Sequence, residues 1–168
     1  TTIHEGTIQV GSSGTTGGLG SGTTSVVNNG RLVFNRSDAI DVTNNITGTG
    51  AVQQIGAGKL TLGGWSSTYS GGTVVDSGTL SYSSSIDAFG TGPLTFNGST
   101  FLWKAADGGT TDISSKSVNF GSAGLTLNPN GNNVNLASPI GAGSSGGLTI
   151  AGSGTLRLSA ANTYGGFT

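Results

Sequence analysis

The chain has 168 residues, enough for one domain, with 33 glycines, no Cys and no Met. Only 8% of the residues are charged, and the formal net charge is −1. Binding to nucleic acid, or to an anionic membrane surface, would require clustered Lys and Arg. No apolar run approaches the length of a membrane helix. We therefore expect no nucleic-acid partner and no membrane insertion by this segment.

The absence of Cys is compatible with an exported protein, because a chain without Cys avoids mispaired disulfides in an oxidising environment. No basic and then apolar signal peptide begins the chain, so any export signal is expected outside this segment. The absence of Cys is thus compatible with an extracellular location.

Apolar residues recur in pairs that are two positions apart along the whole chain. This period places both members of a pair on one face of a β-strand, with polar residues facing the other way. No stretch has helical periodicity, so we expect an all-β protein. The pairs are Ile8/Val10, Leu32/Phe34, Ile40/Val42, Leu60/Leu62, Leu80/Tyr82, Leu94/Phe96, Val118/Phe120, Leu125/Leu127, Val134/Leu136, Leu148/Ile150 and Leu156/Leu158.

Turns rich in Gly and Asn separate the pairs, and two architectures fit them. An Asn-Gly turn such as Asn29-Gly30 favours a hairpin in isolation, which would give an antiparallel sandwich or barrel. However, Ile40 to Leu62 and Val134 to Leu158 share one order of strands and Gly-rich turns. This self-similarity favours a right-handed parallel β-helix, or β-solenoid, with roughly 20 to 25 residues per coil. About seven or eight coils would span roughly 35 Å.

One stretch, residues 56–82, returns in pieces at both ends of the chain. GAGKLTL at 56–62 matches GSGTLRL at 152–158, and GTLSY at 78–82 matches GTIQV at 6–10. We expect repeat copies at 1–22, 56–92 and 152–168 within a single β-solenoid segment, residues 1–168. Repeat units bury their core against neighbours, so this segment is expected to belong to a longer array. The residues predicted to point inward are Leu60, Leu62, Val75, Leu80, Leu94, Leu156 and Leu158.

The repeated stretch resembles the passenger-associated transport repeat, also called the autotransporter-associated β-strand repeat, which reads approximately GxGxLxLxGxNTYxGGTxVxxGTLxL. The resemblance implies a β-helical passenger of a large bacterial surface protein, linked to export and stalk building, and it does not imply an enzyme. Trp65-Ser66-Ser67-Thr68 departs from the pattern where Asn-Thr is usual. The internal copy matches at Gly56, Gly58, Leu60, Leu62, Tyr69, Gly71, Gly72, Thr73, Val75, Gly78, Thr79 and Leu80. The C-terminal copy matches at Gly152, Gly154, Leu156, Leu158, Asn162, Thr163, Tyr164 and Gly166, and the N-terminal copy at Thr1, Ile3, Gly6, Thr7 and Ile8.

Residues that could support catalysis or hold a metal are sparse. His4 is the single histidine and sits in a turn, so a Ser-His-Asp triad is disfavoured and Cys-His chemistry is excluded. Among the aspartates, only Asp38/Asp41 and Asp107/Asp112 are close in sequence. We expect no enzyme, no metal and no cofactor, and we favour a non-catalytic stalk, adhesin shaft or surface filament. The alternative is a carbohydrate-binding or polysaccharide-degrading β-helix.

Two tryptophans are candidates for stacking on a sugar ring. Trp65 follows Gly63-Gly64 in a turn and is the better candidate. Trp103 lies in Phe101-Leu102-Trp103-Lys104, where packing under a loop is favoured. For both residues together a structural role is favoured, because scattered surface aromatic residues are common. A cell-surface glycan or protein is the partner that such a contact would serve.

The two ends of the chain are complementary parts of the repeat. YGGFT at 164–168, read on into TTIHEGT at 1–7, resembles YSGGTVVDSGT at 69–79. The open end of a β-solenoid exposes unpaired backbone groups that template another coil. We therefore predict self-association or continuation of the array end to end. The residues at the join would be Thr1, Thr2, Ile3, Tyr164, Gly165, Gly166, Phe167 and Thr168.

Overall fold

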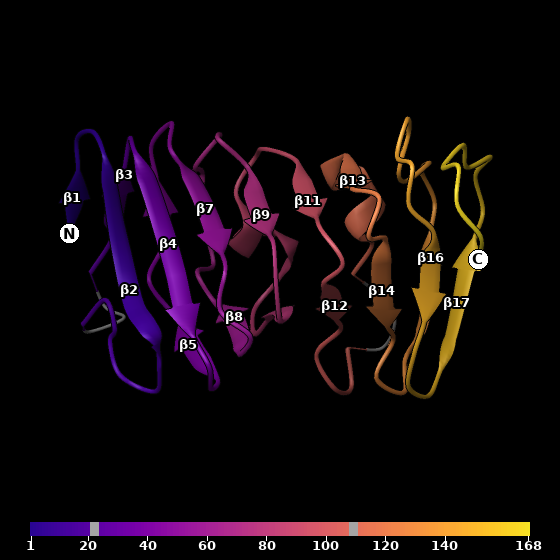
Figure 1. Cartoon of the computed structure of the whole chain (residues 1–168), viewed down its shortest axis with the longest axis horizontal. Helices are drawn as coiled ribbons and strands as arrows, with labels where there is room; N and C mark the ends of the chain where they lie inside the picture. Colours follow the sequence, from indigo (N-terminus) through magenta and orange to yellow (C-terminus); the bar gives the residue numbers. More distant parts are fainter. Residues whose placement is uncertain (21–23, 108–110) are drawn as a thin grey trace.

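Parallel strands coil through about seven turns of a β-solenoid, with no helix of seven residues or more. The structure is a computed structural model that describes residues 1–20, 24–107 and 111–168. Ser21 and Gly22, the last two residues of the first predicted repeat copy, lie outside the described residues. Figure 1 shows the turns stacked along the long axis of the molecule, with the two termini at opposite ends. No helix in the described ranges is long and apolar enough to cross a membrane.

Three sheets form the main faces, and a fourth pair of strands lies near the C-terminus. The first sheet contains β1 (Thr2–Ile3), β3 (Val26–Asn28) and β6 (Ile46–Thr47). The second contains β2 (Thr7–Gly14), β4 (Arg31–Arg36), β7 (Ala51–Gln54), β9 (Thr73–Val75), β11 (Leu94–Phe96) and β13 (Val118–Phe120). The third contains β5 (Ile40–Val42), β8 (Lys59–Leu62), β10 (Thr79–Tyr82), β12 (Thr100–Leu102), β14 (Leu125–Asn128) and β16 (Leu148–Ile150). The last pair is β15 (Asn133–Leu136) and β17 (Thr155–Leu158), and two 3-10 turns, η1 (Ile86–Phe89) and η2 (Ile113–Lys116), complete the elements.

Each described strand pairs in parallel with the strand one coil away, so the hairpin alternative is wrong. The Asn-Gly turns are corners at which the chain passes from one sheet to the next. Asn29-Gly30, for example, joins β3 of the first sheet to β4 of the second. One coil takes 20 residues from Leu32 to its partner Val52, and 26 from Thr100 to its partner Thr126. This longest coil exceeds the expected length and builds the site described below.

Rows of side chains that stack in register fill the interior. On the second sheet Leu32 lies beside Val52, and Leu94 lies beside Val118. Of the residues predicted to point inward, five are buried: Leu60, Leu62, Val75, Leu80 and Leu94. Leu156 and Leu158 are half-buried and pair with Val134 and Leu136, because β17 has a strand on one side only in this chain.

Polar residues that enter these rows make hydrogen bonds inside the molecule. Thr73 is buried next to Val52, and its hydroxyl lies 2.6 Å from the hydroxyl of Tyr69. Gln54 donates from Nε2 to the carbonyl oxygens of Gly56 and Gly58, at 3.2 and 2.7 Å. A buried polar group without such a partner would cost stability. These hydrogen bonds therefore allow a polar residue to occupy an inward position that is otherwise apolar.

The strand-turn-strand motif occupies different corners in its different copies. GTLSY at 78–82 forms β10 in the third sheet, whereas its match GTIQV at 6–10 forms part of β2 in the second sheet. Likewise GAGKLTL ends in β8 of the third sheet, and GSGTLRL ends in β17 of the last pair. The motif therefore encodes a corner with its two flanking strands and not one particular face of the solenoid.

Gly78 shows why these corners require glycine. Its φ is 70°, a conformation that side chains with a Cβ rarely adopt, and a Cβ there would lie 2.3 Å from the carbonyl oxygen of Gly58 in the coil before. Close stacking of successive corners thus fixes glycine at this position.

Candidate functional site

The longest coil leaves the third sheet after β12. Its residues Trp103, Lys104 and Asp107 form a wall beside that sheet. Trp103 anchors the wall because its indole is completely buried. Its Nε1 donates to the carbonyl oxygen of Thr111 at 2.9 Å, and its ring packs edge-on against Phe101 with centroids 4.7 Å apart. Trp103 has no exposed face, so the candidate stacking of Trp103 on a sugar is wrong, and its role is the packing under a loop that the sequence favoured.

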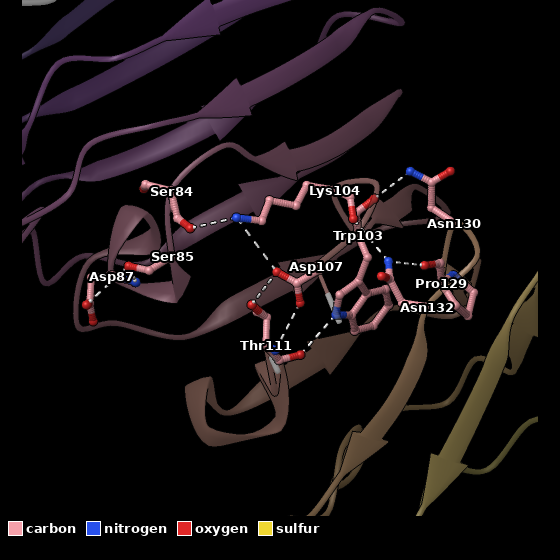
Figure 2. A network of polar contacts seen from close by, with 10 residues as sticks. All are labelled: Ser84, Ser85, Asp87, Trp103, Lys104, Asp107, Thr111, Pro129, Asn130 and Asn132. Carbon is pink, nitrogen blue, oxygen red and sulfur yellow. Dashed lines mark hydrogen bonds and ion pairs between the residues drawn. The ribbon is translucent and has the colours of Figure 1, made fainter. Parts of the chain in front are cut away.

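Lys104 and Asp107 continue the wall, as Figure 2 shows. The ammonium of Lys104 donates to the carbonyl oxygen of Ser84 at 3.2 Å and lies 3.9 Å from a carboxylate oxygen of Asp107. The Asp107 side chain is only 3% exposed and accepts from the backbone N–H and the hydroxyl of Thr111. The hydrogen bond to Ser84 fixes the wall to the coil before it, and the contacts of Asp107 hold the wall together within its own coil.

Two asparagines hold the same wall from the following coil (Figure 2). Asn130 donates from Nδ2 to the carbonyl oxygen of Trp103 at 2.9 Å, and Asn132 donates to that of Lys104 at 3.0 Å. Asn132 also donates to the carbonyl oxygen of Pro129 at 2.7 Å. The wall is therefore bonded to both neighbouring coils, which gives it a defined position.

A groove of about 380 Å³ lies beside this wall, on the outer side of the third sheet. Its floor crosses the strands, because Asp41 lies opposite Thr61 and Thr61 lies opposite Ser81 in successive coils. Lys104 and Asn130 contribute the wall side. Most of the remaining lining is hydroxyl or charged: Asp41, Thr43, Lys59, Thr61, Ser81 and Ser83.

Two buried hydroxyls that line the groove make no hydrogen bond with the described residues. Thr61 is 7% exposed, and its outward direction follows from the inward Leu60 and Leu62 on either side. The Tyr82 hydroxyl is also buried without a well-formed hydrogen bond, although Thr111 and Asp107 approach it. Burial raises the pKa of Tyr82 above its ordinary value, and the nearby Thr111 partly offsets this. Tyr82 is therefore neutral at physiological pH.

Trp65 is the second tryptophan named from the sequence, and its side chain is 74% exposed. It follows Gly64, whose carbonyl oxygen accepts from the Ser84 hydroxyl at 3.4 Å. Ser84 is also the residue that Lys104 contacts. Trp65 thus lies at the corner that follows the third sheet, in the coil before Ser84, and its contact with a glycan stays a prediction.

The residues predicted to join ends lie at opposite ends of the solenoid (Figure 1). Thr2 and Ile3 pair with Val27 and Asn28 as part of β1. At the other end, Tyr164 packs on Phe120 with ring centroids 5.4 Å apart, and the remaining C-terminal residues run along the previous coil. The two sets do not meet within one chain, so an end-to-end contact stays a prediction.

Of the four acidic residues that the sequence placed close together, Asp38, Asp107 and Asp112 have structural partners. Asp38 forms a two-point ion pair with Arg36, whose hydrogen bonds lower the pKa of the Asp38 carboxyl below its ordinary value. Asp112 caps η2 by accepting from the N–H of Ser114 at 2.8 Å. Asp41 is exposed and lines the groove. Among the described residues, no group of three or more His, Cys, Asp and Glu could hold a metal ion.

The groove and its wall were not predicted from the sequence. Apart from the longer interval between Thr100 and Thr126, no local signal marks them. The hydroxyls that line the groove have the same residue types as any outward strand position in this chain.

The fold and its internal copies define a repeat protein of the parallel β-solenoid class. The chain carries the passenger-associated transport repeat, which matches residues 52–81 and 148–168. The internal and C-terminal copies expected from the sequence fall largely on these matches, and the N-terminal copy stays a prediction.

One curated relative is an adhesin autotransporter, BmaC, of Brucella suis biovar 1 (strain 1330). It is 35% identical over 144 residues, which is 81% of this chain. The chain spans only 4% of the length of this relative. No solved structure matches the chain.

Proposed function

We propose that this chain is a length-building segment in the shaft of a surface-exposed or secreted adhesin passenger, with no catalytic role. The observation that carries the proposal is the uninterrupted stacking of parallel strands on the second and third sheets. Each coil adds about 4.8 Å along the axis, so the seven or so turns contribute roughly 34 Å of length. The passenger repeat and the adhesin relative support the same role.

The ends of the segment fit this role. β1 pairs with β3 alone and β17 with β15 alone, so each end offers backbone groups to a further coil. We propose that coils of the same kind stack there, in the same polypeptide or in a second copy. Residues Thr1 to Ile3 and Tyr164 to Thr168 would lie at that contact.

A replacement experiment in the passenger that carries the segment tests the proposal. Deleting the segment is expected to shorten the shaft, and doubling it to lengthen the shaft, by roughly 34 Å in electron micrographs. The matched control replaces the segment with an unrelated β-solenoid of equal coil number. If length is the function, this replacement restores the distance between the distal tip and the cell surface. Loss of display despite restored length would contradict the proposal.

A further inference from the structure

We propose that the groove on the third sheet binds a neutral glycan chain. The ligand would lie across the strands, along the row formed by Asp41, Thr61 and Ser81 in three successive coils. This site is distinct from the stalk role, because a shaft needs no groove. It is also distinct from a contact made by Trp65 alone, since Trp65 is not among the residues that line the groove.

The lining of the groove fits a polyhydroxyl ligand. Hydroxyls of Thr and Ser both donate and accept, as sugar hydroxyls do, so a row of them pairs with a sugar chain in several registers. Asp41 accepts from sugar hydroxyls and Lys59 donates to them, and both side chains are exposed. The volume of about 380 Å³ lies within the range of small-ligand sites.

The buried hydroxyl of Thr61 is an independent observation that points to a ligand. A buried polar group with no partner costs free energy, and native structures explain such groups by water, ions or bound molecules. Thr61 is in the centre of the row, between Asp41 and Ser81. Its hydroxyl oxygen is buried, so it meets a ligand hydroxyl only after the side chain rotates towards the groove.

The wall makes the groove preorganised. Lys104 is held by the coil before it, and the carbonyl oxygens of Trp103 and Lys104 accept from Asn130 and Asn132 in the coil after it. Binding a ligand against such a wall requires little ordering of the protein, which lowers the entropic cost of association.

Other classes of ligand fit the groove less well. An extended peptide binds by adding a strand to a sheet edge, but β8 and β10 are paired on both sides. A nucleic acid needs several cations, and the groove offers Lys59 and Lys104, the second already bonded to Ser84. Asp41 balances the charge of Lys59, and Asp107, 3.9 Å from the Lys104 ammonium, balances that of Lys104, which favours a neutral glycan over an acidic one.

The test is an NMR titration of the whole chain with neutral tri- and tetrasaccharides. One set has β-1,4-linked glucose and N-acetylglucosamine, as in bacterial polysaccharides, and the other has mannose-rich chains, as in host glycoproteins. Oligogalacturonate is the acidic arm. Amide shifts confined to β5, β8 and β10 with either neutral set support the proposal, and the set that binds identifies the source. Stronger binding of the acidic arm, or no shifts at millimolar ligand, overturns it.

Two variants locate the binding. Thr61→Val keeps the side-chain shape but removes the hydroxyl, and it is expected to weaken binding roughly 3- to 10-fold, the effect of one hydrogen bond. The matched control is Thr95→Val, on the outer side of β11 in the second sheet, which should bind as the unmodified chain does. Unchanged affinity of a folded Thr61→Val variant, shown by its retained amide spectrum, would also overturn the proposal.

Discussion

At the residue scale, the two tryptophans show how position in the coil decides the role of one side-chain type. Trp65 follows two glycines in a corner and projects into solvent, whereas Trp103 directly follows β12 and is completely buried. Burial of the indole contributes strongly to stability, and an exposed indole contributes little.

The first prediction compares these two residues. Trp103→Ala is expected to lower the free energy of unfolding by about 3 to 5 kcal/mol, because it leaves a large cavity and removes the contact with Phe101. Trp65→Ala is the matched control and should change the free energy of unfolding by less than about 0.5 kcal/mol. Chemical denaturation measures both values, and similar losses for the two variants would contradict the assignment.

The second prediction concerns the inward row. Leu62 is 1% exposed, so Leu62→Asp would bury an unpaired carboxylate and is expected to cost several kcal/mol or prevent folding. Thr95→Asp places the same charge on the outside of β11 and should unfold close to the temperature of the unmodified chain. Thermal unfolding of the Leu62 variant like that of the unmodified chain would show that the faces are inverted.

At the element scale, one arginine connects the end of β4 to the corner that follows β2. Arg36 donates to the carbonyl oxygens of Thr15 and Gly17 as well as to Asp38. The hydrogen bond with Asp38 also raises the pKa of Arg36, so the guanidinium stays charged at any physiological pH. A single side chain thus holds two successive corners together.

The third prediction follows from the lowered pKa of Asp38. Because the folded pKa lies below the unfolded one, the ion pair stabilises the fold at neutral pH, and its contribution is lost as the pH falls through the folded value. Arg36→Gln is expected to raise the carboxyl pKa of Asp38 towards the ordinary value and to speed hydrogen exchange at residues 15–17. Arg31→Gln, at the start of the same strand, is the control. Carbon-detected NMR titration measures the pKa, and no change in the Arg36 variant would refute the pairing.

At the scale of the whole molecule, the solenoid is nearly one-dimensional, because each coil contacts mainly its two neighbours. β8 and β10 have partners on both sides, whereas β17 has one partner in this chain. Local stability should therefore depend on position along the axis.

The fourth prediction is a gradient of hydrogen exchange in the isolated chain. Amides in β8 and β10 are expected to exchange more slowly than those in the terminal strands β1 and β17, because a strand with one partner opens without breaking a second ladder. Mass spectrometry after exchange reads this order. Uniform protection across all strands would indicate all-or-none opening and would count against the one-dimensional description.

The sequence by itself determined the all-β class, the coil period and most of the core. Period-two pairs such as Leu60/Leu62 and Leu94/Phe96 specify an inward face wherever the backbone is extended, so five of the seven named core residues are buried. The corner glycines and their repetition also separated the parallel coil from a hairpin. These properties are local or repeat at a fixed spacing, which is why they can be read from the sequence.

Only the tertiary structure decided the groove. Asp41, Thr61 and Ser81 follow one another at intervals of twenty residues in the sequence. They become neighbours because successive coils stack in register. The wall depends on hydrogen bonds from Asn130 and Asn132 to a segment more than twenty residues earlier, which no local pattern encodes. The groove therefore exists because one coil is longer than its neighbours. The extra residues of that coil form a wall only when the coils are stacked.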